Sequence, residues 1–183
     1  MRKPLLLGLA ALAALTIACS TGDTSSSVTG GDAQDVATAE SGAKTTAKAK
    51  LGQTVTLTND SLGDKTVVDV TVANAKQYAK EPGDFGSEPE NGTFLVLDVT
   101  AVCKGGSYHV NPFNFKFVAK DGTVTEGAFV SFKPDLRATD LSKGQKAAGK
   151  IAFDVPKAAI KGGKIQIDGV GFDYDKPAAF WTL

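Results

Sequence analysis

Alternating apolar and polar side chains across residues 51–183 restrict the fold more than any other feature of the chain. In the stretch 66–75, for example, Val68, Val70 and Val72 fall on one face of an extended backbone, with polar residues between them. A period of two residues is typical of a half-buried β-strand. Because no segment shows the 3.6-residue period of a helix, the sequence predicts an all-β domain.

Turn residues separate the predicted strands at short intervals. One pair is Asp121-Gly122, a dipeptide that favours a tight hairpin between antiparallel strands. About seven strands, each with one buried face, predict an immunoglobulin-like antiparallel β-sandwich, with a β-barrel as the alternative. The strand-like segments cover residues 53–59, 66–75, 93–103, 113–117, 124–132, 150–155, 164–174 and 179–183.

The start of the chain has the pattern of an export signal. Arg2 and Lys3 precede an uncharged apolar stretch over residues 5–17, which is shorter than the roughly 20 residues of a membrane-spanning helix. The stretch ends in LTIAC (residues 15–19), which resembles the lipobox of bacterial lipoproteins. We therefore expect residues 1–18 to be a lipoprotein signal peptide; an ordinary secretory signal is the alternative.

Processing at this site would make Cys19 the first residue of the mature chain and place a diacylglyceryl group on its thiol. Two acyl chains suit stable attachment, because a single chain holds a protein to a membrane only weakly. The expected location is the extracytoplasmic face of the cell membrane, with the lipid on Cys19 as the anchor.

Residues 20–50 consist mainly of small and polar side chains. Such a segment cannot bury enough apolar surface to offset the entropy of ordering it. The sequence therefore predicts a lipidated Cys19 with a flexible, disordered tether over residues 19–50, followed by one β-sandwich domain over residues 51–183.

The charge of the mature chain is close to balanced. Removing Arg2 and Lys3 leaves 18 basic residues against 20 acidic ones, a net charge of −2. This balance argues against nucleic acid as a partner, because phosphate binding needs a concentrated basic face. Since no block of like charge occurs, the polypeptide is also expected to lack a polybasic patch for a membrane surface.

Cys103 would have no intramolecular disulfide partner if Cys19 carries lipid. It follows Val99 and Ala101 on the apolar face of its predicted strand, so we expect a small buried side chain; a reactive or intermolecular free thiol is the alternative. The single histidine, His109, could approach Cys103, but the pair lacks a third group to orient it. The sequence therefore predicts no enzyme.

The segment 76–91 is long for a connection in a compact domain and contains two prolines. We interpret it as a candidate partner-binding loop, with a mobile acidic loop that keeps a sheet edge soluble as the alternative. Its candidate residues are Glu81, Asp84, Phe85, Glu88 and Glu90.

Two pairs of residues near the C-terminus are further candidate sites. Asp173 and Asp175 could bind calcium, but calcium takes about six or more oxygen ligands and no Asp- and Gly-rich loop accompanies them. Phe180 and Trp181 could form a sugar-stacking platform, although a side chain like Trp181 more often fills the core. The sequence predicts no metal site and no cofactor.

Several motifs in residues 51–183 resemble the bacterial family catalogued as domain of unknown function 4352, which is similar to the mycobacterial secreted immunoprotective antigen family. The resemblance covers nearly all of this region and implies an extracytoplasmic immunoglobulin-like sandwich. It supplies no catalytic or ligand-binding residues. The motifs are LG at 51–52, GTFLVLDV at 92–99, NP at 111–112 through DG at 121–122, LSKGQ at 141–145 and GKIAFDVP at 149–156.

These observations lead to one main hypothesis for the function. The chain is expected to be a non-enzymatic, membrane-anchored module that presents loops to another envelope protein, a wall polymer or a host molecule. A small-ligand or metal-binding lipoprotein is the second hypothesis, and an enzyme with no recognised motif is the third.

Overall fold

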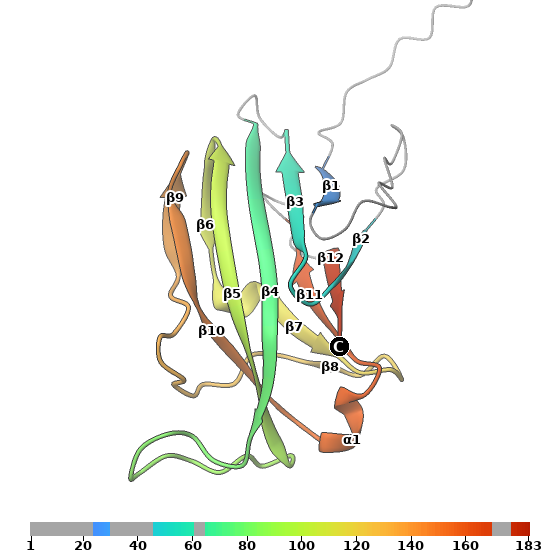
Figure 1. The fold of residues 1–183 in the computed structure, drawn as a ribbon, viewed down its shortest axis with the longest axis vertical. Coiled ribbons are helices and arrows are strands. Elements are labelled where there is room, and N and C mark those ends of the chain that lie inside the picture. The colour runs from blue at the N-terminus through green and yellow to red at the C-terminus, as the bar shows by residue number, and fades with distance from the viewer. Residues whose placement is uncertain (1–23, 30–45, 61–64, 170–176) are drawn as a thin grey trace, which may run out of the picture.

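The computed structural model describes residues 24–29, 46–60, 65–169 and 177–183, which form two β-sheets packed face to face (Figure 1). We call them sheet A and sheet B. Sheet A has the strand order β1 (Thr24–Thr29), β3 (Thr54–Asn59), β4 (Thr66–Tyr78), β5 (Thr93–Gly105) and β10 (Lys146–Val155). Sheet B has the order β2 (Ala47–Lys50), β12 (Pro177–Thr182), β11 (Lys164–Asp168), β7 (Phe115–Val118) and β8 (Val124–Thr125).

Three short elements complete the described chain. β6 (Ser107–Val110) and β9 (Thr139–Ser142) form a small antiparallel sheet beside β5, and neither of the two was among the predicted strands. The 3-10 helix η1 (Pro112–Asn114) precedes β7, and the single-turn helix α1 (Lys157–Ile160) follows β10. The predicted all-β sandwich is therefore confirmed, with two open sheets in the described residues and more strands than expected.

The core lies between the two sheets, where the alternating apolar residues of each strand meet. This burial is the main favourable contribution to folding, at roughly 25 cal/mol for each Å² of apolar surface removed from water. Sheet A contributes mainly aliphatic side chains and sheet B mainly aromatic and β-branched ones. The largest fully buried side chains are Val55, Leu57, Val68, Val70, Leu95, Leu97 and Phe153 from sheet A, and Phe115, Phe117, Ile165, Ile167 and Trp181 from sheet B.

The hairpin predicted at Asp121-Gly122 is present between β7 and β8. Gly122 has φ +93°, a conformation that glycine adopts without strain. The Asp121 carboxylate accepts a hydrogen bond from the Thr123 N–H, which holds the pKa of that carboxyl below its ordinary range. The turn chemistry read from the sequence thus fixes the pairing of these two strands.

The prediction of a flexible tether over residues 20–50 is wrong for two segments. Residues 24–29 form β1 at the edge of sheet A, antiparallel to β3. Residues 47–50 form β2 at the edge of sheet B, parallel to β12, with Ala47 and Ala49 buried. An added edge strand gains its stability from backbone hydrogen bonds, so it can form without the large apolar side chains that the prediction required.

The strand expected over residues 124–132 ends after Thr125. From there the chain leaves sheet B and crosses the edge of β10 onto the outer face of sheet A, where Phe132 packs between Tyr78 and Phe94. We call residues 126–138 the β8–β9 segment. Phe132 is therefore buried, as the alternation suggested, but against a different sheet, whereas Phe129 of the same segment is exposed.

β4 is longer than predicted because it contains a β-bulge. Asn74 adopts φ +54° where the register with β5 shifts, and its side-chain amide donates to Asp98 (2.9 Å). Beyond the bulge the strand continues to Tyr78. The loop that the sequence placed at residues 76–91 therefore begins only at Ala79.

Candidate functional site

The β8–β9 segment creates an open groove against the edge of β10. The segment is held at both of its ends by backbone hydrogen bonds to β10: the Ala128 N–H donates to the Ala152 carbonyl (2.8 Å), and the Leu136 N–H donates to the Lys150 carbonyl (3.0 Å). Between these two points it bows outward and leaves a groove of about 480 Å³. The lining residues are Glu81, Pro112, Phe113, residues 127–131, residues 135–137 and residues 150–152.

Two exposed phenylalanines lie in this groove. Phe113, in η1, is 49% exposed, and Phe129, in the β8–β9 segment, is 91% exposed. Their ring centroids are 5.1 Å apart with a tilted geometry. Large apolar side chains that cluster in a concave surface, instead of lying singly, mark interaction sites. The two rings therefore form an exposed apolar surface within the groove.

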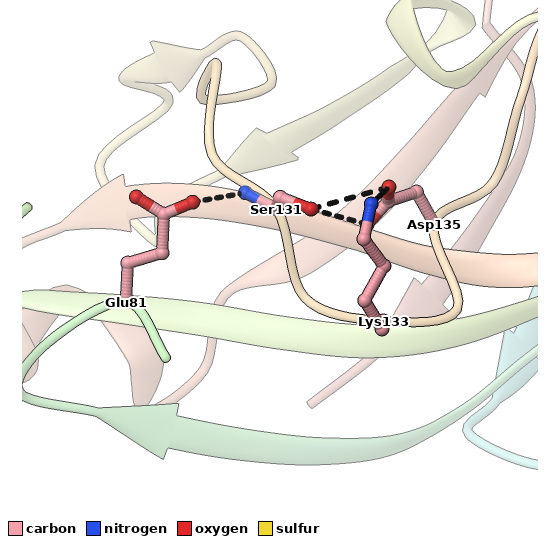
Figure 2. A network of polar contacts seen from close by, with 4 residues as sticks. All are labelled: Glu81, Ser131, Lys133 and Asp135. Atoms are coloured by element: carbon pink, nitrogen blue, oxygen red, sulfur yellow. Dashed lines mark hydrogen bonds and ion pairs between the residues drawn. The ribbon is translucent and has the colours of Figure 1, made fainter. Parts of the chain in front are cut away.

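A polar network that includes Glu81, Ser131 and Asp135 (Figure 2) forms one wall of the groove. The Glu81 carboxylate accepts a hydrogen bond from the Ser131 N–H (2.6 Å). The Ser131 hydroxyl donates to the Asp135 carboxylate (3.1 and 3.2 Å), which also forms an ion pair with Lys133. The network thus ties the loop after β4 to the β8–β9 segment, two parts of the chain 50 residues apart.

These contacts lower the pKa of both carboxyl groups. The Ser131 N–H, followed by the Ser87 hydroxyl, holds the pKa of Glu81 below its ordinary value of 4.5. The Lys133 ammonium is the main reason why the pKa of Asp135 is also lowered. Both groups are therefore ionised near neutral pH, and the charged form is the one that makes the hydrogen bonds.

Acidification is expected to loosen this wall. Because folding lowers the pKa of Glu81, its hydrogen bonds contribute stability that is complete above about pH 4.5 and is lost as pH falls through the lower, folded-state value. The protection of the Ser131 amide, which is its exchange rate relative to that of an unfolded chain at the same pH, should therefore decrease in that acidic range. Glu81→Gln should abolish this titration while Glu88→Gln, at an exposed position, should retain it; an unchanged profile in Glu81→Gln would contradict the assignment.

Of the five residues predicted for the partner-binding loop, only Glu81 lines the groove. Phe85 lies at the tip of the loop, fully exposed at 102%, and Asp84, Glu88 and Glu90 are also exposed. Backbone hydrogen bonds order the loop at its base, from Glu81 N–H to the Ser87 carbonyl (2.8 Å) and from Glu90 N–H to the Asp154 carboxylate (2.7 Å). The loop is held in place, but its acidic residues do not converge on one site.

Cys103 lies in the core and His109 lies on the surface. The Cys103 side chain is fully buried, with its thiol near the carbonyls of Gly105 (3.4 Å) and Gly106 (3.5 Å). The exposed His109 Nδ1 instead contacts the Asp140 carboxylate (2.7 Å). The structure therefore places the thiol where the sequence expected a small buried side chain.

This burial makes a prediction for the reactivity of the thiol. A thiol reacts as the thiolate, and a buried one has neither access to a reagent nor solvent to stabilise its charge. We expect Cys103 to resist iodoacetamide in the folded protein and to be labelled rapidly in denaturant, as measured by mass spectrometry. Fast labelling of Cys103 under native conditions would contradict its position in the core.

The remaining predicted sites have different outcomes. Trp181 is fully buried, so it fills the core and cannot form a sugar-stacking platform. Cys19, Asp173, Asp175 and the signal peptide lie outside the described residues. Within the described ranges, no three His, Cys, Asp or Glu side chains converge where they could share a metal ion. Nor does that part of the chain contain a helix long and apolar enough to span a bilayer.

Sequence reasoning missed Phe113, Phe129, Ser131 and Asp135 as site residues. The strands predicted over residues 113–117 and 124–132 assigned Phe113, Phe129 and Ser131 to sheet faces, and Asp135 lies beyond both predicted strands. The one local signal was Pro134, which cannot donate a backbone hydrogen bond and so marks the end of regular pairing.

Comparison with known proteins identifies the family and supports the fold. The sequence model of the family DUF4352, a domain of unknown function, matches residues 49–176 of this chain. The secreted protein MPT63 of Mycobacterium tuberculosis is 21% identical, with a TM-score of 0.59 over 76% of this chain and 98% of that one. The yjhA protein of Bacillus subtilis is 19% identical, with a TM-score of 0.51 over 66% of this chain and 81% of that one.

Comparison with curated proteins finds no sequence match. The two structural similarities concern the β-sandwich alone, because identities near 20% do not carry a function from one fold member to another. The family model spans both sheets from β2 to beyond β11 and includes every strand that borders the groove. The chain therefore belongs to the DUF4352 family, a β-sandwich domain of unknown function.

Proposed function

We propose that the chain is a membrane-anchored, extracytoplasmic binding protein that captures a partner in the groove between the β8–β9 segment and β10. The apolar stretch before LTIAC (residues 15–19) supports export and lipid attachment at Cys19. The description of the similar mycobacterial protein as secreted also favours a location outside the cytoplasm.

The exposed pair of Phe113 and Phe129 is the observation that carries this proposal. Aromatic side chains in concave, partly enclosed positions contribute much of the energy of protein interfaces. Phe129 stands on a segment that backbone hydrogen bonds and the Glu81–Ser131 contact already hold in place. A partner would therefore bury the rings without first having to order the loop, which lowers the entropic cost of binding.

A segment of another envelope protein fits this groove better than the other two expected partners, a wall polymer or a host molecule. The groove combines two apolar rings with charged groups of both signs, Glu81 and Asp135 on one wall and Arg137 and Lys150 nearby. A polypeptide can present apolar side chains to the two rings and polar or charged groups to the charges of both signs. A uniformly charged polymer would leave one of these sets of charges unmatched.

We also propose that the protein binds without catalysing a reaction. A nucleophile and its base must lie within hydrogen-bonding reach of each other, roughly 3 Å. Cys103 is buried and hydrogen-bonded to backbone carbonyls, whereas His109 is exposed and paired with Asp140. The described groove is lined instead by side chains suited to contact and recognition.

Site-specific photocrosslinking in the cells that make the protein tests the groove. A photoreactive phenylalanine analogue at position 129 should give a discrete adduct, because the ring lies where a partner binds. The same analogue at position 85 provides the matched control, since Phe85 is at least as exposed but lies on another loop. Phe113→Ala should weaken the adduct at 129; equal labelling from positions 85 and 129 would refute the groove as the binding site.

The anchor is tested separately by intact mass measurement of the mature chain. The expected product begins at Cys19, carries a diacylglyceryl group and remains in the membrane fraction. Cys19→Ser should release the protein from that fraction, because no acyl chain then holds it. An unmodified Cys19 in the wild-type chain would remove lipid anchoring from the proposal and leave groove binding to stand alone.

The size of the groove supports a small ligand as a second candidate. Its volume of about 480 Å³ falls within the range of small-molecule pockets, about 300–1,000 Å³. Short peptides and N-acetylglucosamine oligosaccharides are suitable probes in a thermal-shift assay, since a ligand that binds only the folded state raises the melting temperature. The shift should disappear in Phe129→Ala if the ligand occupies the groove.

A further inference from the structure

The outer face of sheet B gathers lysines from strands that are far apart in the sequence. One row across the sheet places Lys48 of β2 opposite Phe180, then Gln166 and then Lys116. The next row places Lys50 opposite Thr182 and then Lys164. Because Ala47, Ala49, Ile165 and Trp181 point into the core, the residues that alternate with them face outward.

Three of the four lysines on this face have no carboxylate within ion-pairing distance in the described ranges, namely Lys48, Lys50 and Lys164. The Lys164 ammonium lies 3.9 Å from the centre of the Phe180 ring, which is a cation–π contact on the sheet surface. The fourth, Lys116, forms an ion pair with the buried Asp168 at 2.9 Å.

The outer face of sheet A shows a different arrangement. There Lys104 pairs with Asp69 (3.5 Å) and Lys150 pairs with Asp98 (3.3 Å). The two faces therefore differ in net charge although the whole chain is nearly neutral. Pairing of β2, β12 and β11 thus brings lysines from separate segments onto one face, which the absence of charged blocks in the sequence did not predict.

We propose that this face of sheet B lies against the anionic phospholipid headgroups of the membrane. The lysines and Phe180 lie on four neighbouring strands, β2, β12, β11 and β7, which together are about 14 Å wide at the usual strand spacing of roughly 4.8 Å. Lysine stems and an aromatic ring are side chains that can lie at a membrane interface. A positively charged sheet face complements a negatively charged membrane surface.

The position of β1 favours a membrane over a soluble polyanion. Thr24 of β1 follows Cys19 by five residues, and β1 lies beside both β2 and β12 at this edge of the sandwich. A lipid anchor together with a basic patch is the two-signal arrangement that gives stable membrane attachment. The inference thus rests on the membrane location proposed above, but it does not depend on the groove.

Vesicle binding tests the basic face without the lipid. The full chain carrying Cys19→Ser is mixed with vesicles of equal parts phosphatidylglycerol and phosphatidylcholine, and with vesicles of phosphatidylcholine alone. Every protein compared has the same first 18 residues, so the contribution of the apolar stretch at residues 5–17 cancels. We expect a preference for the anionic vesicles that weakens as salt is raised, because salt screens exposed charges.

Lys48→Glu, Lys50→Glu and Lys164→Glu together should abolish this preference. Each basic side chain near an anionic surface strengthens binding by about fivefold, so the loss of three should weaken it by roughly 100-fold. The matched control changes Lys80, Lys143 and Lys146 to Glu, three exposed lysines away from sheet B with the same change in net charge. The control should keep most of the binding.

A second triple variant distinguishes charge from folding. Lys48→Arg, Lys50→Arg and Lys164→Arg should bind anionic vesicles as the parent does, and circular dichroism should show the same fold for all three variants. Equal losses in the two glutamate variants, or tighter binding to soluble polyphosphate than to vesicles, would overturn the proposal. Because every protein in this experiment carries Cys19→Ser, a negative vesicle result would not contradict lipid attachment or groove binding. In the same way, a negative result for either of those two proposals would leave the vesicle result valid.

Discussion

Replacing Trp181 with alanine is expected to lower the free energy of unfolding by about 4 kcal/mol. Trp181 is fully buried in β12, between the two sheets. Its truncation removes the largest buried side chain and leaves a cavity that the surrounding strands can fill only in part. The indole Nε1–H also donates to the Gln53 carbonyl (2.9 Å), so the variant removes this hydrogen bond as well. Chemical denaturation of the two proteins measures the difference.

Two variants separate the causes of this loss. Trp181→Phe keeps most of the apolar volume and removes the hydrogen bond, so it should cost less, about 1–2 kcal/mol. Phe180→Ala changes the adjacent residue, which is half-buried on the outer face and contacts Lys164. It should cost about 1 kcal/mol. A similar loss from Phe180→Ala and Trp181→Ala would contradict the assignment of Trp181 to the core.

Gly149→Ala is expected to destabilise the protein by about 3 kcal/mol and to detach part of the β8–β9 segment. A Cβ atom at position 149 would lie 2.2 Å from the Leu136 nitrogen and 2.5 Å from the Asp135 carbonyl oxygen. Both are backbone atoms, so no side-chain rotation can relieve the clash. The segment must therefore move away from β10, which breaks the hydrogen bonds that join Lys150 to Pro134 and Leu136.

Two measurements follow from this change. Chemical denaturation reports the loss of stability, and hydrogen exchange of the Leu136 and Lys150 amides reports the detachment. Gly127→Ala is the matched control, because its nearest contact would be the Phe113 ring at an ordinary 3.7 Å. It should change the stability by no more than about 0.5 kcal/mol. If both variants behave alike, the close approach at Gly149 does not hold the groove together.

The parts of the fold that depend on local pattern could be predicted from the sequence. Alternation in β3, β4 and β5 identified strands and their buried faces, and Asp121-Gly122 identified the hairpin between β7 and β8. The burial of Cys103 followed from the same alternation. Each of these conclusions rests on neighbours in the sequence, where the period of a strand is fixed by backbone geometry.

The groove could not be predicted because it depends on a choice between two sheets. Residues 124–132 have a pattern that would suit a strand beside β7, yet only Val124–Thr125 pairs there. Phe132 instead packs against Tyr78 and Phe94, and Gly149 allows the backbone to approach β10 closely enough for hydrogen bonds. Contacts between residues so far apart in the chain leave no periodic signal in either segment.

The cluster of lysines on the outer face of sheet B could not be predicted for a similar reason. Lys164 is separated from Lys48 and Lys50 by more than a hundred residues, so no short window of the sequence contains all three. They become neighbours because β2 pairs with β12 and β12 with β11. A search for runs of like charge detects patches on one segment and misses those that strand order creates.

β1 and β2, the two strands that precede Leu51, also determine where the chain can be truncated without changing the edges of the two sheets. β1 covers the edge of sheet A at β3, and β2 covers the edge of sheet B at β12. A protein beginning at Leu51 would make β3 and β12 the edge strands, and these contain larger apolar side chains than the Ser-rich β1 and the Ala- and Lys-rich β2 that otherwise form those edges. Recombinant versions trimmed to that point should therefore self-associate, whereas those that retain residue 24 onward should remain dispersed.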